Sequence, residues 1–488
     1  MQILFTAFEA DPFMKTGGLA DVVGSLPAAV NALKDGDPSD VRVMLPKYSG
    51  IPQIYMEKME FIAYFYVDLS WRHEYCGIFS LEHKGVTYYF LDSEKYFYRS
   101  NLYGDNDDCE RMAFFSKACL EACLHLKDFQ PDIIHCNDWH TALVPVYLRE
   151  FYRGTSLEKA RTVFTIHNLK FQGIYDPYVI GDTLGLHNTP ADAQLRQWKD
   201  YSCCANLMLG ACTYADRITA VSPSYAEEIC TPYYGEGLDW LFNMRRVSLS
   251  GILNGIDYDV WNPETDAFLK GKDSPKNPDY TNYGPSSLAR KSHNKMALQK
   301  ELGLKVDKEI PMFAIISRLT EQKGLDLVTY LLPHIAESEM QLVVLGVGDD
   351  HFEEAFTWYA QHCPDKISAQ IRFDTALSHK LYAAADVMMI PSRFEPCGLT
   401  QMIAMKYGTL PLVRETGGLK DTVNTQNGFS FLTFNADDMK YALDCALDIW
   451  YNNHREWQKK QKKGMSEDYS WTASAKAYKK LYQELVCC

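Results

Sequence analysis

Short runs of β-branched and apolar residues alternate with helical or loop segments along most of this 488-residue chain. Such alternation predicts parallel sheets whose strands are joined by crossover helices. The pattern stops once, in a polar stretch at about residues 263–294, and then resumes. Because the chain is also too long for one ordinary domain, we expect two α/β domains. The runs expected to form strands are 3–8, 41–45, 86–91, 132–136, 162–166, 217–221, 312–316, 342–345, 387–390 and 410–413.

The sequence Thr-Gly-Gly-Leu-x-Asp-x-Val occurs twice, at residues 16–23 and 416–423. Each copy follows an expected strand and leads into a plausible helix. A glycine turn at the start of a helix presents backbone N–H groups and a positive helix end, and lets an anion approach closely. The first copy is preceded by Lys15, a cation on the same loop. We therefore interpret the repeat as two phosphate-binding turns that contact one ligand.

Composition excludes several classes of function. The chain has 49 basic and 63 acidic residues, a net charge of −14, which argues against nucleic acid or an anionic membrane as the main partner. Its 14 cysteines contain no C-x-x-C pair, so a zinc ribbon or thioredoxin motif is not expected. No stretch reaches the roughly 18 apolar residues of a membrane span, and no secretion signal is visible. A cytoplasmic protein with reduced thiols is the simplest expectation.

Polar side chains follow the expected strands, where a doubly wound fold binds its ligands. Arg318 and Lys323 come after one strand and can form a cationic clamp. With Lys15 they offer three cations, each worth roughly 4 kcal/mol at about 4 Å from a phosphate oxygen near a protein surface. Glu395, at another strand end, can bind sugar hydroxyls or stabilise positive charge at an anomeric carbon. The other polar strand-end residues are Asn137, Asp138, His167, Asn168 and Cys397.

Other chemistries lack their signatures. His135 and His140 flank Asp138, but their spacing matches no metalloprotease motif, so we expect no metal. Gly346 and Gly348 follow a strand, yet His351 stands where a dinucleotide fingerprint needs its last glycine. The chain contains no phosphate-binding G-x-x-x-x-G-K-[ST] loop, no G-x-S-x-G elbow and no H-E-x-x-H helix.

Several motifs, in order along nearly the whole chain, resemble those of bacterial glycogen synthases and plant starch synthases. The resemblance implies a GT-B fold, in which two Rossmann-like domains face each other across a cleft and the last helix crosses back to the first domain. It also implies transfer of glucose from ADP-glucose to an α-1,4-glucan such as glycogen, with retention and without a metal or other cofactor. The motifs are 15–22, Ile166-His167-Asn168-Leu169, Ser317-Arg318-Leu319, 391–399, 407–411 and 416–419.

The same resemblance implies roles for individual residues. Glu395, His167, Lys323 and Arg318 correspond to the family's catalytic groups. Phe373 corresponds to an aromatic residue that stacks on adenine, and Tyr96 and Phe97 to the acceptor side. The residues that correspond to donor-binding positions are Lys15, Gly18, Asp21, Asp138, Asn168, Asn254, Phe373, Cys397, Thr416, Gly417, Gly418 and Leu419.

On this resemblance the expected domains are an acceptor-side domain at 1–260, a linker at 261–300, a nucleotide-sugar domain at 301–468 and a C-terminal helix at 469–488. Two positions depart from the family. Asn137 replaces the first histidine of an H-D-W-H stretch, and Ile403 stands where many related retaining enzymes have a second glutamate.

Two alternatives keep the same fold. One is a catalytically silent glucan-binding protein; the other is a glycogen phosphorylase, which resembles a much longer chain with a pyridoxal phosphate lysine. The preference for ADP-glucose over UDP-glucose and the oligomeric state do not follow from the sequence.

Overall fold

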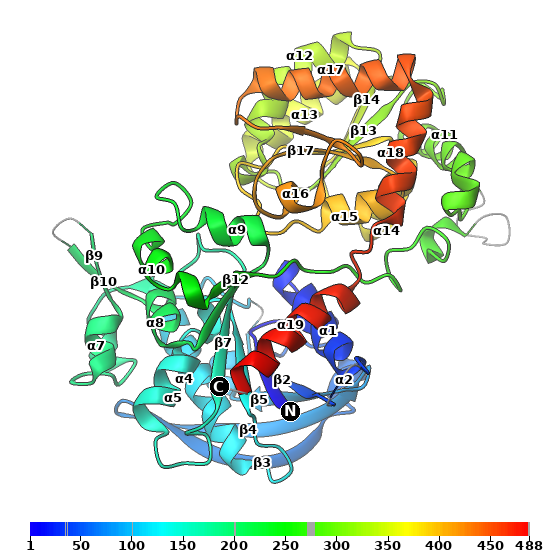
Figure 1. The fold of residues 1–488 in the computed structure, drawn as a ribbon. Helices are drawn as coiled ribbons and strands as arrows, with labels where there is room; N and C mark the ends of the chain where they lie inside the picture. Colours follow the sequence, from blue (N-terminus) through cyan, green and yellow to red (C-terminus); the bar gives the residue numbers. More distant parts are fainter. Residues whose placement is uncertain (35, 37, 100, 200–201, 271–278, 487–488) are drawn as a thin grey trace. The chain divides into compact units, whose positions relative to one another are not determined.

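The computed structural model describes residues 1–34, 36, 38–99, 101–199, 202–270 and 279–486. The chain folds as two compact units (Figure 1). Unit 1 comprises Met1–Gly255 and Trp471–Cys488, and unit 2 comprises Ile256–Ser470. The stretch 261–300, expected to be a linker, belongs to unit 2 and includes part of a helix, Lys291–Leu302. Residues 271–278 of the expected linker and residues 487–488 of the expected C-terminal helix lie outside the described residues.

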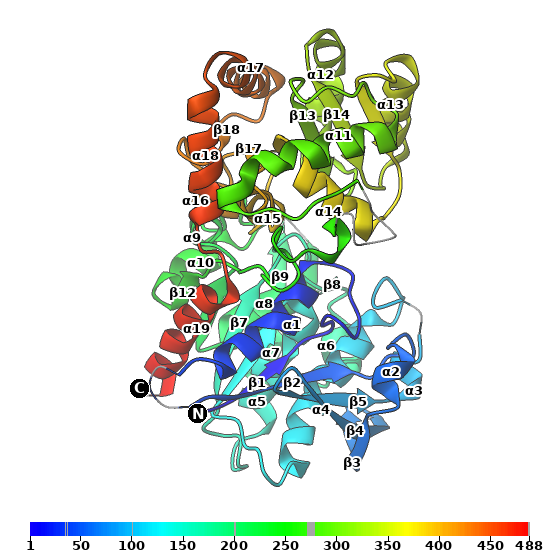
Figure 2. The same cartoon turned by 90° about the vertical axis from the view of Figure 1, so that its right-hand side faces the viewer.

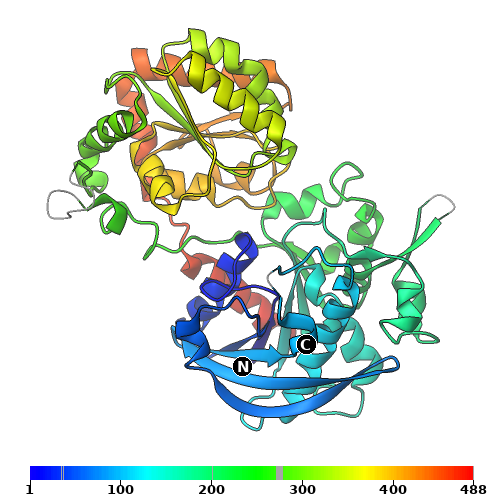
Figure 3. The same cartoon turned by 180° about the vertical axis from the view of Figure 1, so that it is seen from behind.

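Unit 1 is built on a nine-stranded sheet of order β12-β11-β7-β6-β1-β2-β5-β4-β3. Strands β12 to β5 are parallel, whereas β4 pairs antiparallel with both β5 and β3. The long β3–β4 hairpin, light blue in Figure 3, curves along one edge of the sheet. The strands are β1 (Gln2–Thr6), β2 (Asp40–Pro46), β3 (Glu60–Leu69), β4 (Arg72–His83), β5 (Val86–Asp92), β6 (Ile133–Asn137), β7 (Arg161–Ile166), β11 (Arg217–Ala220) and β12 (Leu249–Gly251).

Helices cover this sheet, and the C-terminal helix α19 belongs to the same unit. Figures 1 and 2 show α19 alongside α1. Tyr482 of α19 also contacts His135 of β6, with 2.7 Å between its hydroxyl and Nδ1. The helices are α1 (Gly18–Asn31), α2 (Gln53–Met56), α3 (Glu94–Phe97), α4 (Asp108–His125), η1 (Trp139–Thr141), α5 (Leu143–Phe151), α6 (Val179–Asp182), α7 (Pro190–Gln194), α8 (Leu207–Tyr214), α9 (Pro223–Glu228), α10 (Asp239–Met244), η2 (Arg246–Ser248) and α19 (Trp471–Val486).

Local sequence signals explain individual elements of unit 1. Ser222 followed by Pro223 is a typical helix start, and α9 begins there. The Ser222 hydroxyl accepts a hydrogen bond from the Tyr225 N–H at 3.2 Å. A separate antiparallel sheet of order β8-β10-β9 completes the unit. Its strands are β8 (Ile174–Tyr175), β9 (Arg196–Lys199) and β10 (Ser202–Asn206).

Unit 2 contains a six-stranded, fully parallel sheet of order β15-β14-β13-β16-β17-β18. Its central strands are buried and rich in β-branched and other apolar residues, as expected for a sheet covered on both faces. The strands are β13 (Met312–Ile316), β14 (Gln341–Leu345), β15 (Ile367–Gln370), β16 (Val387–Ile390), β17 (Leu410–Arg414) and β18 (Phe429–Phe431).

The helices of unit 2 pack on both faces of this sheet (Figure 1). Among the described residues of the whole chain, no helix has the length and apolar character that a membrane crossing requires. The helices of unit 2 are η3 (Ala267–Leu269), η4 (Pro285–Arg290), α11 (Lys291–Leu302), η5 (Glu321–Lys323), α12 (Leu325–Glu337), α13 (Asp350–His362), α14 (Thr375–Ala384), α15 (Thr400–Lys406), α16 (Gly417–Thr422), α17 (Ala436–Asn452) and α18 (His454–Ser466).

Candidate active site

The loop from β1 to α1 carries the first group of predicted residues. Lys15 lies 2.5 Å from the Asp21 carboxylate in a partly exposed ion pair. Gly18 is the first residue of α1, and a Cβ built on it meets no atom within 4 Å. Within the described part of the chain, the N–H groups of Gly18 and Leu19 have no hydrogen-bond acceptor. This helix start is therefore open and offers two donors to a ligand.

A buried carboxylate that the sequence analysis did not single out holds this loop in place. Glu9 accepts hydrogen bonds from the Thr16 N–H at 2.5 Å, from the Thr16 hydroxyl at 2.8 Å and from the Tyr103 hydroxyl at 3.1 Å. Burial raises the pKa of Glu9, which these hydrogen bonds partly offset. In the sequence, the only indication of this role is that Glu9 directly follows an apolar strand run. Tyr103, its hydrogen-bond partner, is distant in sequence.

Two predicted residues meet at the carboxyl ends of β6 and β7. His167 Nε2 lies 3.0 Å from Asn137 Oδ1, and the Asn137 amide group donates to the Thr6 carbonyl at 3.2 Å. Burial lowers the pKa of His167 to about 3, so the imidazole is neutral at pH 7. Because an amide oxygen only accepts, the His167 proton lies on Nε2 and Nδ1 is left as an acceptor. Asn137, which departs from the family pattern, thus fixes the tautomer.

Asp138 follows β6 in a strained conformation. Its φ of 63° and ψ of 176° lie in a region that is almost restricted to glycine and costs about 1–3 kcal/mol. The carboxylate is buried and accepts the Trp139 N–H at 2.7 Å. Burial raises the pKa of Asp138 to about 7. Strain and an unfavourably buried acid at one strand end are features of functional sites.

Two predicted asparagines complete the polar set of unit 1. Asn168 directly follows His167, and its side-chain oxygen accepts the Lys170 N–H at 3.1 Å. Asn254 lies in the loop after β12 and is buried. Its Oδ1 has no hydrogen-bond donor among the described residues. A buried acceptor without a partner is costly, and a ligand hydroxyl would satisfy it.

In unit 2 the predicted charged residues lie at the carboxyl ends of β13 and β16. Lys323 Nζ lies 2.6 Å from Glu395 Oε2, and the Ser392 hydroxyl donates to the same oxygen at 2.8 Å. Glu395 is buried and Lys323 is partly buried. Arg318 is exposed, and its guanidinium has no partner among the residues that the structure describes. Glu395 thus offers a ligand one carboxylate, and Lys323 and Arg318 offer it two cations.

The second glycine turn packs directly against the Glu395 loop. The Gly418 N–H donates to the Glu395 carbonyl at 3.2 Å. A Cβ on Gly417 would lie 2.0 Å from that same carbonyl oxygen, and one on Gly418 would lie 2.0 Å from the Cys397 oxygen. Gly417 also has a φ of 44°. Gly417 and Gly418, which lie between Thr416 and Leu419, thus support the loop that carries Glu395 and Cys397.

The predicted aromatic residues lie in contrasting places. Phe373 stands between β15 and α14 with 90% of its surface exposed, so its ring is available for stacking. The rings of Tyr96 and Phe97 are fully buried instead. Phe97 packs among Phe8, Phe114 and Phe115, and the Tyr96 hydroxyl donates to Glu110 at 2.6 Å. Neither ring offers a face to an acceptor, because α3 turns both into the core.

His135 and one acidic cluster of the described residues carry metal-ligand atoms, but other side chains already contact them. His135 uses both ring nitrogens, on Tyr482 at 2.7 Å and on Thr165 at 2.6 Å. Asp105, Asp107 and Asp108 are close enough together to share an ion, but all three contact arginines, namely Arg99 or Arg111.

Comparisons with known proteins agree with this arrangement. Residues 2–244 match the family model described as "Starch synthase catalytic domain", and residues 298–464 match "Glycosyl transferases group 1". The glycogen synthase of Lachnospira eligens is 48% identical over 494 residues, covering 99% of each chain. That of Anoxybacillus flavithermus is 46% identical over 494 residues, covering 100% of this chain and 98% of the relative.

Solved structures extend the comparison. The catalytic domain of starch synthase IV from Arabidopsis thaliana, bound to ADP and acarbose, matches with a TM-score of 0.86 and 34% identity, covering 100% of this chain and 99% of that one. Sucrose-phosphate synthase from Thermosynechococcus elongatus shares the fold, with a TM-score of 0.61 and 18% identity, covering 100% of this chain and 99% of that one. Identity near one half along the whole length leaves one assignment: the chain belongs to the glycogen synthase family and is a glycosyltransferase with the GT-B fold.

Proposed function

We propose that the enzyme transfers glucose from ADP-glucose to the non-reducing 4-hydroxyl of an α-1,4-glucan with retention of configuration. The observation that carries the proposal is the Lys323–Glu395 pair beside the exposed cation of Arg318. The carboxylate suits the sugar of a nucleotide-sugar donor, and the two cations suit the diphosphate next to it. The starch synthase neighbour was solved with ADP and acarbose, a nucleotide and a glucan-like ligand, which supports the same assignment.

In this proposal Lys15, Arg318 and Lys323 bind the diphosphate, together with the open N–H groups at the start of α1. Each cation near a phosphate oxygen contributes roughly 4 kcal/mol, which favours departure of the diphosphate. Phe373 stacks on adenine. Asp138, Asn168, Asn254 and Cys397 contact the sugar side of the donor, and Asp21 holds Lys15 until the donor arrives.

The chemistry proceeds by front-face displacement. A double displacement needs a second carboxylate on the face of the sugar opposite the leaving group. The position eight residues after Glu395 is Ile403, and we assign no second carboxylate to that face, because Asp138 is engaged by the Trp139 N–H at 2.7 Å. The departing diphosphate oxygen therefore takes the proton of the incoming hydroxyl, while Glu395 stabilises the positive charge that develops at the anomeric carbon. Neutral His167 acts as a hydrogen-bonding group rather than as an acid.

The decisive experiment incubates the enzyme with glycogen and labelled ADP-glucose or UDP-glucose. We expect incorporation from ADP-glucose. Glu395→Ala should lower kcat by about 10²-fold or more. Glu339→Ala, which removes an exposed glutamate of the same unit, is the matched control and should keep the full rate.

Absence of incorporation from both donors would overturn the enzymatic assignment, and incorporation from UDP-glucose alone would overturn the donor assignment. Because the diphosphate contacts are assigned to both units, Lys15→Ala and Arg318→Ala should each raise the donor KM. A normal donor KM in either variant would remove that residue from the proposal.

A further inference from the structure

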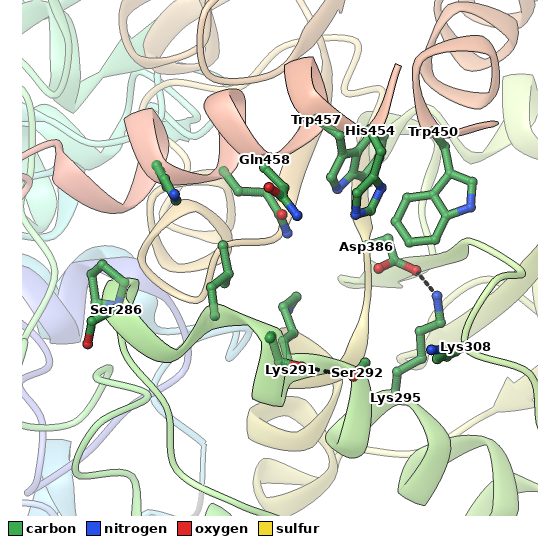
Figure 4. Close-up of a pocket in the computed structure, with 15 residues that line it drawn as sticks. Ser286, Lys291, Ser292, Lys295, Lys308, Asp386, Trp450, His454, Trp457 and Gln458 are labelled. Atoms are coloured by element: carbon green, nitrogen blue, oxygen red, sulfur yellow. Dashed lines mark hydrogen bonds and ion pairs between the residues drawn. The ribbon is translucent and has the colours of Figure 1, made fainter. Parts of the chain in front are cut away.

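A cavity of about 260 Å³ lies in unit 2, at the amino-terminal edge of its sheet (Figure 4). Lys308 precedes β13 and Asp386 precedes β16, so the cavity is at the sheet edge opposite the one that carries Arg318 and Glu395. Its walls come from η4, α11, α17 and α18. It is therefore separate from the proposed donor site, and an inference about it does not depend on the proposed transfer.

The charged groups of this cavity are mostly cations. Lys291 and Lys295 lie buried inside it, and Lys308 and Lys462 lie exposed at its rim. Its only acid, among the described residues that line it, is Asp386, which is already paired with Lys295 at 2.7 Å. A local excess of positive charge in a chain of net charge −14 indicates a site for an anion.

One of the two buried cations, Lys291, is incompletely satisfied by the described residues. The Lys291 ammonium donates to the Tyr382 carbonyl at 2.9 Å and to the Thr409 hydroxyl at 2.7 Å. An ammonium group has three protons to donate, so one remains. Burial lowers the pKa of Lys291 to about 7, and a bound anion would favour its charged form.

The opposite wall is aromatic. Trp450, His454 and Trp457 line it from α17 and α18 (Figure 4). The Trp457 side chain is 1% exposed, and its indole N–H has no acceptor among the described residues. Trp450 lies under the Lys295 ammonium, 4.4 Å from ring centroid to Nζ. The wall therefore offers an unused hydrogen-bond donor beside apolar ring atoms, which suits a ring that carries hydroxyl groups or ring nitrogens.

We propose that this cavity binds a small phosphomonoester carried on a ring, either a hexose phosphate or a nucleoside monophosphate. The phosphate binds at the rim, where Lys308 and Lys462 supply the exposed cations, and the ring lies deeper, toward the indole N–H of Trp457. Lys295 is paired with Asp386 and Lys308 with Glu309 at 3.6 Å, but a neutral glucan would bring no counter-charge for Lys291 and Lys462. The volume, below the roughly 300–1,000 Å³ of sites for drug-sized ligands, excludes a larger polyphosphate with its base.

Calorimetric titration of the full chain tests the proposal. The probes are glucose 6-phosphate, AMP, inorganic phosphate and glucose. The test variant is Lys308→Ala/Lys462→Ala, which removes both rim cations. The control is Lys305→Ala/Lys459→Ala, which removes two exposed lysines from the same loop and the same helix that do not line the cavity. All four positions are exposed, so both double variants should fold like the wild type.

We expect glucose 6-phosphate or AMP to bind the wild type and the control with a Kd below about 1 mM, and the test variant to bind it at least roughly tenfold more weakly. The probe that shows this loss identifies the ring. Equal binding to both double variants would overturn the proposal, because the ligand would then lie elsewhere. Failure of both ring phosphates to bind would overturn it, and so would inorganic phosphate or glucose binding as tightly as they do.

Discussion

Asp138 is a residue whose environment opposes the stability of unit 1. It combines a glycine-like backbone conformation with a buried carboxyl group whose pKa is raised by burial from 3.8 to about 7. Between these two values the folded protein holds a proton that the unfolded chain has released. The contribution of Asp138 to the stability of unit 1 therefore falls as pH rises from about 4 to about 7, by on the order of 4 kcal/mol at most.

Replacing Asp138 with asparagine should remove this cost. Asparagine keeps an oxygen for the Trp139 N–H and has the same shape as aspartate, so the local structure is preserved. We expect Asp138→Asn to resemble the wild type in stability near pH 4 and to exceed it increasingly up to pH 7, in urea unfolding. Asp176→Asn is the control, since that exposed carboxylate also accepts a backbone N–H, at 2.8 Å. A stability difference that does not change with pH would contradict the argument.

At the scale of elements, the repeated Thr-Gly-Gly-Leu turn has two different roles. In the first copy Gly18 opens a helix of 14 residues, and a Cβ on it would meet no atom of the described residues within 4 Å, so none of them requires a glycine there. In the second copy a Cβ on Gly418 would collide with backbone atoms of Cys397. The first glycine is needed only if a ligand approaches it closely, whereas the second is needed for folding.

Substituting alanine at the two positions should separate these roles. Gly18→Ala should leave stability unchanged or raise it by up to about 1 kcal/mol. It should also raise the donor KM, because the methyl group occupies the space of a phosphate. Gly418→Ala should destabilise unit 2 by about 1–3 kcal/mol. Thermal unfolding and donor titration measure both effects. A normal donor KM in Gly18→Ala, or normal stability in Gly418→Ala, would show that the interpretation is mistaken.

For the whole molecule, the parallel strands were predictable from sequence because each is a short, buried, β-branched run. All the runs named from sequence form strands, among them β13 and β16 at the predicted bounds. The hairpin β3–β4 was missed. Its exposed positions carry Tyr64, Tyr66 and Tyr75, so hydrophobicity does not alternate in the way that marks a half-buried strand.

The site residues that directly follow a strand were predictable, because a polar residue after an apolar run can be seen in the sequence. The residues that tertiary packing brings to the site from other loops were not predictable. Tyr103 reaches Glu9 from another loop, and nothing near it in sequence indicates that contact. The resemblance assigns Tyr96 and Phe97 to the acceptor side, but the packing of α3 against α4 buries them. An aromatic residue alone does not reveal whether it belongs to a surface or to the core.

The two units should respond differently to acid. In unit 1 burial lowers the pKa of His135, His140 and His167 to about 3 each. Below pH 6.5 these three histidines therefore bind protons in the unfolded chain but stay neutral in the folded unit. The free energy of unfolding of unit 1 therefore falls as pH falls. Each histidine accounts for about 1.4 kcal/mol per pH unit, and the raised pKa of Asp138 offsets one of them. We expect a net loss of roughly 3 kcal/mol per pH unit between pH 6 and pH 5.

His140 offers the sharpest test of this acid sensitivity. Its ring stacks between Phe8 and Tyr103, and its Nδ1 has no hydrogen-bond partner among the described residues, so an apolar side chain can replace it. His140→Leu should reduce the pH dependence of unit 1 by about 1.4 kcal/mol per pH unit, while His187→Leu, at an exposed position, should not change it. Urea unfolding at pH 6 and pH 5, with hydrogen exchange to assign amides to each unit, measures the effect. Earlier opening of unit 2 amides in acid, or an unchanged slope in His140→Leu, would contradict the assignment.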